Sequence, residues 1–247
     1  KGLPVINLLN IEKEEAVRAI VSTDIYDEDH YLLYVTRNGV TKRTTLAEFA
    51  RINVSGKIAI DLREDDELMD VKITDGTAII GIGSSNGKMA SFYETDVRAM
   101  GRTAAGVRGI RLDEGAYVVG VTTSLEGNLI FALTTKGYGK LTLADEYRLT
   151  KRGSKGVITI KESERTGTLA GIRAIKGDED LFVTTESGMV IRTNFKEISM
   201  TSRNTMGVRV IRLRPDDVVS SFAVVEKGIA YEEEEHENEE RVEHHEE

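Results

Sequence analysis

The segment GVRGI at residues 106–110 has counterparts along the chain, and their regular spacing decides the fold. Each counterpart opens with a glycine followed by an apolar alternation, then an acidic turn such as residues 64–67. The opening glycines, at intervals of 54, 50, 50 and 51 residues, are Gly2, Gly56, Gly106, Gly156 and Gly207. A short apolar run that predicts a strand follows each acidic turn, at residues 17–21, 68–73, 117–121, 169–172 and 218–225. A period near 50 residues indicates one supersecondary unit repeated along the chain.

A second glycine series lies inside the first and predicts a hairpin in each repeat. Its turns follow apolar runs and occupy residues 36–39, 84–87, 134–137 and 185–188. Two of them contain Asn-Gly, which favours a type I′ turn because both residues tolerate positive φ. No stretch keeps a helical period of 3.6 over three turns. Each repeat therefore reads as about four short strands, and the fold class as all-β.

We predict a propeller-like array of four-stranded blades, each of about 50 residues, in one domain over residues 1–231. The expected blades cover residues 1–52, 53–101, 102–150, 151–202 and, incompletely, 203–231. There are five first halves but four second halves, so we expect more chain upstream of Lys1 to complete a ring.

Composition and charge exclude several classes of protein. The 247 residues are 40% hydrophobic and contain no cysteine, which argues against a disordered chain, a disulfide scaffold or a cysteine-based zinc site. The longest uncharged stretch, residues 76–87, is shorter than the roughly 18 residues that a membrane span needs. The lack of cysteine, together with no apolar leader at Lys1, fits a reducing cytoplasm.

The negative charge is concentrated at the C-terminal end. Residues 226–247 hold 11 Glu against Lys227 and Arg241, which accounts for the whole formal charge of −9. The preceding residues are therefore neutral overall. Because runs of like charge repel themselves, we expect residues 232–247 to be a disordered acidic tail.

No residue pattern predicts a catalytic, metal or cofactor site in this chain. His30 lies in an acidic turn and reads as a surface residue, and the acidic cluster at residues 64–67 lacks the spacing of an EF-hand loop. Gly81, Gly83 and Gly87 do not have dinucleotide-binding spacing, and no helical pattern follows them. We therefore assign no catalytic residue, no metal and no cofactor to this chain.

Basic residues recur beside the opening glycines and near the hairpin turns. In a repeating array such residues occupy equivalent places, which predicts one positive track for a polyanion rather than scattered surface charge. The richest segment is KRGSKG at residues 151–156, where glycine lets the backbone approach a phosphate closely. The candidate phosphate-contacting residues are Lys42, Arg43, Arg51, Lys57, Arg102, Arg108, Lys140, Lys151, Arg152, Lys155, Arg192, Arg203 and Arg209.

Several segments resemble the C-terminal domain of the A subunit of bacterial DNA gyrase, over residues 1 to about 225. They are KGLPVINLL at residues 1–9, REDDEL at 63–68, GRTAAGVRGI at 101–110 and GYGK at 137–140. The resemblance implies a six-bladed β-pinwheel, five blades of which are present, with strands exchanged between neighbouring blades. It also implies that a basic outer rim binds and wraps duplex DNA without sequence preference.

The parent that this resemblance implies is an ATP-dependent type II topoisomerase that introduces negative supercoils. The resemblance implies that the catalytic residues and the sites for ATP and Mg²⁺ lie outside this chain. It implies the B subunit and the rest of the A subunit as partners, and no membrane. The wrapping motif of the family lies in its first blade, which would precede Lys1, and the nearest match here is TKRGSKG at residues 150–156. The alternatives are a propeller that binds protein instead of DNA, and the matching domain of the topoisomerase IV A subunit.

Overall fold

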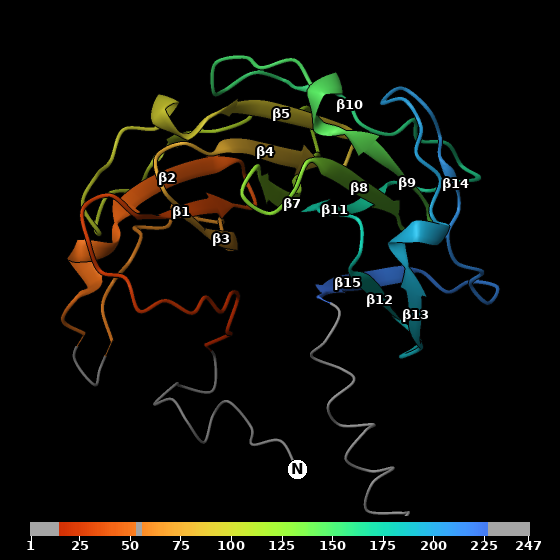
Figure 1. The fold of residues 1–247 in the computed structure, drawn as a ribbon, viewed down its shortest axis with the longest axis horizontal. Helices are drawn as coiled ribbons and strands as arrows, with labels where there is room; N and C mark the ends of the chain where they lie inside the picture. Colours follow the sequence, from red (N-terminus) through yellow and green to blue (C-terminus); the bar gives the residue numbers. More distant parts are fainter. Residues whose placement is uncertain (1–14, 53–55, 227–247) are drawn as a thin grey trace, which may run out of the picture. The chain divides into compact units, whose positions relative to one another are not determined.

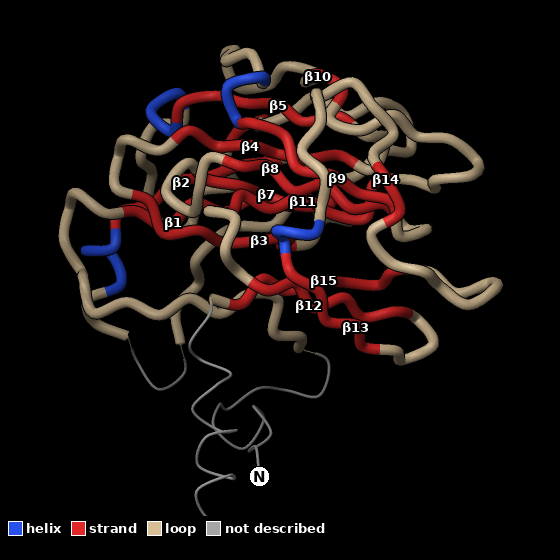
Figure 2. The backbone as a smooth tube through the Cα atoms, turned by 45° about the vertical axis from the view of Figure 1, so that its right-hand side comes forward, coloured by secondary structure: helices blue, strands red, loops and turns tan. Residues whose placement is uncertain are grey.

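The computed structural model describes residues 15–52 and 56–226, so the segment 1–9 and the acidic tail at 232–247 lie outside the described residues. The chain divides into two compact units. Unit 1 comprises residues 1–125 and 147–158, and unit 2 comprises residues 126–146 and 159–247. Figure 1 and Figure 2 show strands throughout the described chain, with helix limited to short turns.

The described helical residues are all in 3-10 turns: Leu46–Phe49 (η2), Glu94–Asp96 (η3), Ala144–Glu146 (η4) and Phe195–Glu197 (η5). The all-β prediction is confirmed, and no helix among the described residues has the length and apolar character needed to cross a bilayer.

Unit 1 holds two four-stranded antiparallel sheets (Figure 1). The first has the order β3-β1-β2-β6, from Leu68–Thr74, Tyr31–Thr36, Val40–Thr45 and Val107–Arg108. The second has the order β10-β5-β4-β7, from Val157–Ile158, Lys88–Tyr93, Ile79–Ser84 and Val118–Thr123. Leu33 of β1 and Ile80 of β4 belong to one buried core, so the two sheets share their apolar interior.

Unit 2 also holds two antiparallel sheets. One has the order β11-β8-β9-β14, from Leu169–Ile175, Leu129–Thr134, Tyr138–Leu143 and Val208–Arg209. The other has the order β13-β12-β15, from Val190–Asn194, Asp180–Thr185 and Val219–Val225. In the core, the Phe131 ring meets Phe195 edge-on at 5.0 Å and Phe222 at 5.3 Å between ring centroids.

The four predicted hairpins are present as β1–β2, β4–β5, β8–β9 and β12–β13. In the first, Gly39 has φ +84° and its amide donates to the Thr36 carbonyl at 3.0 Å. The type I′ prediction is wrong, because Asn38 and Asn86 are not among the residues with positive φ. The geometry matches a three-residue loop in which only the final glycine is left-handed, a turn that also suits strand twist.

Each sheet draws its strands from successive repeats. In the first sheet, the β1–β2 hairpin pairs with β3 from the next repeat, and Val40 and Thr41 pair with β6 from the repeat after that. The β10 strand joins β5, and β14 joins β9, in the same way. This exchange ties non-adjacent repeats together and gives the β-pinwheel topology.

The exchange explains the opening glycines of the last three repeats. Gly106 has φ +89°, and a Cβ there would lie 2.6 Å from the Thr41 carbonyl oxygen. Gly156 and Gly207 also have positive φ, and each lies equally close to backbone of the strand that it crosses. A side chain at these positions would strain the backbone and collide with the sheet, so glycine recurs with the repeat.

One predicted strand is absent. Residues 17–21 have an extended apolar pattern but form no strand, whereas the other four predicted runs form β3, β7, β11 and β15. Each of those four pairs with the hairpin of the preceding repeat.

Candidate nucleic-acid interface

Three of the predicted phosphate-contacting residues are buried, and the prediction for them is wrong. Lys42 and Lys140 are fully buried, each three residues after a hairpin glycine. The Lys42 Nζ donates to the carbonyl of Ala59 at 2.6 Å and to the carbonyl of Arg102. Burial lowers the pKa of the Lys42 ammonium to about 8. A lysine held in this way stabilises the neighbouring loops and is not available to a phosphate.

Lys140 has the same place and role in unit 2. Its Nζ donates to the carbonyls of Ser202 at 2.9 Å, Arg203, and Thr205 at 3.2 Å, and to the Thr205 hydroxyl at 3.0 Å. Burial lowers its pKa to about 8 as well. These hydrogen bonds from Lys140 therefore hold the loop at residues 201–207 in place.

Arg43 is the third correction. Its Nη1 contacts the carboxylate of the fully buried Glu94 at 3.2 Å, and its Nε donates to the Val97 carbonyl at 2.9 Å. Glu94 also accepts from the Thr74 hydroxyl at 2.7 Å. Because a buried carboxylate needs such partners, Arg43 is part of the core network that holds η3 against the first sheet.

The loop at residues 150–156 carries three cations, and main-chain bonds fix it on both sides. Thr150 donates its amide to the Ser91 carbonyl at 2.9 Å, and Gly153 donates to the Gly109 carbonyl at 2.6 Å. On the same side, the Arg111 amide donates to the Ser154 carbonyl at 2.8 Å. The loop therefore lies beside residues 107–111, and the structure gathers these basic side chains of unit 1: Arg108, Arg111, Lys151, Arg152 and Lys155.

An arginine four residues before the opening glycine has the same geometry in two repeats. Arg152 donates from Nη1 to the Arg108 carbonyl at 3.1 Å, and Arg102 donates from Nη1 to the Ile58 carbonyl at 2.9 Å. Both acceptors lie two residues after the opening glycine of the preceding repeat. Arg203 occupies the same offset in unit 2, where its amide donates to the Glu146 carboxylate at 2.7 Å. The side chains of Arg102 and Arg152 are therefore held in the same way in two repeats.

Two acids partly neutralise the unit 1 cluster. Lys151 pairs with Asp96 at 2.9 Å, although its side chain remains 89% exposed. Asp113 lies between Lys88 at 2.6 Å and Lys155 at 3.0 Å, and these two ammonium groups lower the pKa of its carboxyl to about 2. Exposed pairs of this kind are weak, so the ammonium groups can exchange these carboxylates for phosphates.

The remaining candidates lie at or near the surface. Arg51, Arg108 and Arg209 are exposed, and Lys57 is half-buried with its Nζ 3.2 Å from the Glu48 carbonyl. Arg192 is exposed but donates from Nε and Nη2 to Asp180 at 3.1 and 2.6 Å. None of these positions conflicts with a phosphate contact, which stays a prediction for them.

The sequence reasoning missed several cations that the structure places with the candidates. Arg111 joins the unit 1 cluster, and in unit 2 the predicted Arg209 lines a pocket with four cations that were not predicted: Lys136, Arg165, Arg212 and Arg214. The signal was present for two of them, since Arg111 and Arg212 each lie five residues after an opening glycine. Lys136 and Arg165 come from turns whose association depends on the fold.

The fold is all-β and repeated, its strands are exchanged between repeats, and basic loops lie beside its opening glycines. These features place the protein in the class of β-pinwheels. The sequence profile of the family described as "DNA gyrase C-terminal domain, beta-propeller" matches residues 30–75, 82–124, 128–176 and 179–226. The chain belongs to this family. The resemblance of its sequence to the gyrase A C-terminal domain is thereby confirmed.

Curated relatives are named as the A subunit of DNA gyrase. The protein of Ureaplasma parvum serovar 3 is 45% identical over 224 residues, which cover 91% of this chain and 26% of the relative. The protein of Staphylococcus aureus strain NCTC 8325 is 42% identical over 230 residues, covering 92% of this chain and 26% of the relative. The chain thus spans about a quarter of the length of these relatives.

Solved structures share the fold. A DNA gyrase A C-terminal domain matches with a TM-score of 0.81 at 24% identity, covering 91% of this chain and 75% of that one. The C-terminal domain of a DNA topoisomerase IV matches with a TM-score of 0.85 at 26% identity, covering 100% and 76%. The fold is therefore common to both kinds of topoisomerase, whereas the curated relatives favour gyrase A.

Proposed function

We propose that this chain binds duplex DNA through phosphate contacts made by the basic loops beside its opening glycines. We also propose that it bends the duplex around itself. The observation that carries the proposal is the arginine that recurs four residues before the opening glycine. Arg102 and Arg152 donate to backbone carbonyls at equivalent positions of successive repeats. Equivalent cations at equivalent places suit a duplex, whose phosphates are evenly spaced. Contacts of this kind position DNA without reading its sequence.

The bending part of the proposal follows from energetics. Smooth bending of a short duplex costs on the order of 1–6 kcal/mol, and additional phosphate contacts made along the bend offset that cost. In unit 1, the basic loop at residues 150–156 lies beside residues 107–111, which also carry cations, and this supports contact with more than one stretch of backbone.

In the whole protein, we propose that the wrap supports ATP-dependent negative supercoiling by gyrase. Its partners would be the B subunit, together with the rest of the A subunit, in the cytoplasm. ATP, Mg²⁺ and the catalytic residues would act elsewhere in that enzyme, so this chain contributes DNA binding and not catalysis. Gyrase is favoured over topoisomerase IV by the names of the curated relatives, and over a protein-binding propeller by the family match.

The salt dependence of DNA binding tests the proposal. Lys151→Ala with Lys155→Ala removes two exposed ammonium groups, while Arg152 is kept because it fastens the loop to the Arg108 carbonyl. Each lost phosphate contact should reduce the slope of log K against log salt by about 0.9, so we expect a reduction of about 1.8. The fall in affinity should be similar for unrelated duplex sequences.

A two-site control removes the same charge elsewhere. Arg63→Ala with Lys176→Ala takes away two exposed cations outside the basic loops, one of them in an acidic turn that repels phosphate. Fluorescence anisotropy with a labelled duplex at several salt concentrations should show the parent slope for this control. A folded Lys151/Lys155 variant with the parent slope would remove the basis for the proposal.

A further inference from the structure

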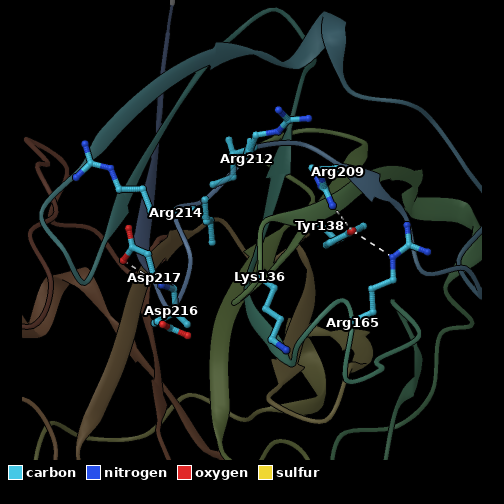
Figure 3. Close-up of a pocket in the computed structure, with 11 residues that line it drawn as sticks. Lys136, Tyr138, Arg165, Arg209, Arg212, Arg214, Asp216 and Asp217 are labelled. Carbon is cyan, nitrogen blue, oxygen red and sulfur yellow. Dashed lines mark hydrogen bonds between the residues drawn. The ribbon is translucent and has the colours of Figure 1, made fainter.

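Unit 2 contains a pocket of about 680 Å³ that shares Arg209 with the predicted phosphate-contacting residues (Figure 3). Three segments form it: the β8–β9 turn with the start of β9, the loop before β11, and residues 209–218 between β14 and β15. Its charged residues are Lys136, Arg165, Arg209, Arg212, Arg214, Asp216 and Asp217. Five cations against two acids leave a formal charge of +3 on one concave surface.

The acids do not neutralise this surface. The Asp217 carboxylate accepts hydrogen bonds from the Ser187 amide at 3.1 Å and from the Ser187 hydroxyl at 2.6 Å, so it closes a neighbouring turn. Within residues 15–52 and 56–226, the guanidinium groups of Arg212 and Arg214 make no hydrogen bond or ion pair. The cations outnumber the acids, so a net repulsion remains among them, and a bound anion would relieve it.

Tyr138 orders two of the arginines. Its hydroxyl oxygen accepts from the Arg165 Nε at 3.3 Å and from the Arg209 Nη2 at 3.0 Å, as the dashed lines in Figure 3 show. The tyrosine is itself buried, which fixes the position of the two forks. A guanidinium has five N–H donors, so each arginine keeps donors for another acceptor. Such paired forks suit the oxygens of a phosphate.

The corresponding place in unit 1 carries a different charge. Counting from the opening glycine, Arg108 and Arg111 correspond to Arg209 and Arg212, but Asp113 of unit 1 corresponds to Arg214. Asp113 pairs with Lys88 and Lys155 and so compensates its surroundings. In unit 2 the same backbone position carries an arginine instead, which makes this pocket strongly cationic.

We propose that the pocket binds a phosphate-bearing anion through the guanidinium groups of Arg209, Arg212 and Arg214 and the Lys136 ammonium. Tyr138 is the one aromatic residue among those that line it, and the guanidinium carbons of Arg165 and Arg209 lie over its ring at 5.6 and 5.5 Å from the centroid, so the ring is not free to stack a base. The ligand group is therefore phosphate and not nucleobase. Its source is either the DNA backbone, in which case the inference rests on the proposed function, or a free oligophosphate, in which case it does not.

The test uses Arg212→Gln with Arg214→Gln, because neither guanidinium supports the described structure. Calorimetric titration with sodium tripolyphosphate at low salt should show saturable 1:1 binding to the parent and to the Arg63/Lys176 control. Binding to the double variant should be at least about tenfold weaker, the effect of 1.4 kcal/mol in affinity. Arg214→Asp, which installs the residue that unit 1 has at this place, lowers the charge of the pocket by the same two units and should weaken binding to a similar extent.

A DNA arm separates the two sources. If backbone phosphate is the ligand, the double variant also lowers the salt slope of duplex binding by about 1.8, and tripolyphosphate competes with DNA. If a free oligophosphate is the ligand, tripolyphosphate binding falls and the DNA slope is unchanged. The inference is overturned if the double variant matches the parent in both arms. A parent that does not bind DNA contradicts the proposed function alone, and the tripolyphosphate arm then decides the pocket.

Discussion

Replacing the buried Lys140 by methionine should destabilise unit 2 and loosen its basic loop. Methionine keeps most of the apolar stem but removes the ammonium that donates to three carbonyls and one hydroxyl of residues 202–205. Hydrogen bonds to a charged group contribute about 1.5–3 kcal/mol each, and the three N–H donors of the ammonium, shared among these four acceptors, therefore give roughly 4.5–9 kcal/mol before compensation.

Two effects reduce that sum. The acceptors lie in a loop with exposed neighbours such as Ser202 and Asn204, so water can replace part of the lost bonding. The change also removes a buried charge, whose desolvation lowers the pKa of Lys140 to about 8. We therefore expect a net loss of about 2–4 kcal/mol, close to that for breaking other buried charged contacts.

Urea unfolding followed by far-UV circular dichroism at pH 7 measures the effect. With a slope of about 1–3 kcal/mol per molar urea, the midpoint of unit 2 should fall by roughly 1–2 M. Lys42→Met should cost unit 1 less, because Lys42 has two acceptors. Lys176→Met, at an exposed position, serves as the control.

The pH dependence of the stability difference between the parent and Lys140→Met provides an independent test. Below about pH 8, Lys140 is protonated in both the folded and the unfolded chain, and the full cost of burying its charge is present. Between about pH 8 and the ordinary lysine pKa, the unfolded chain binds the additional proton, so the parent should gain stability relative to Lys140→Met as pH rises. Equal stability of parent and variant at pH 7, with unchanged amide exchange at residues 201–207, would refute the reasoning.

Two further predictions concern the strand exchange and the unit 1 cluster. Gly106→Ala brings a Cβ within 2.6 Å of a β2 carbonyl at φ +89° and should lower the free energy of unfolding by about 2–3 kcal/mol in urea titrations. Gly56→Ala, also at positive φ but with open space around it, should cost only about 1 kcal/mol, and equal losses would contradict the role of close approach. Asp113 stabilises the fold above its unfolded pKa and loses that contribution as pH falls through about 2, because Lys88 and Lys155 favour its ionised form. Asp113→Asn should therefore reduce the fall in melting temperature between pH 4 and 2, and it should tighten duplex binding at low salt. If the variant behaves like the parent in both assays, the pairs of Asp113 with Lys88 and Lys155 affect neither stability nor DNA binding.

Much of the fold could be read from the sequence because its determinants are local. Turn glycines such as Gly39 and Gly137 specify hairpins through positive φ, and alternating apolar residues specify the strands between them. The repeat then multiplies each local signal, which is why the positions of the four hairpins were predicted correctly although their turn type was not.

The partners of the strands and the environment of the cations depended on the tertiary structure. Val107 pairs with Thr41 across 66 positions, and no local pattern says which earlier strand a two-residue segment will join. Lys42 and Lys151 are both basic residues in polar sequence, yet one is covered by two loops and the other faces solvent. Whether a side chain is buried depends on which other segments pack over it in the folded structure. The sequence by itself therefore determined the repeating units and their charge. Only the assembly of those units decided which charged side chains a ligand can reach.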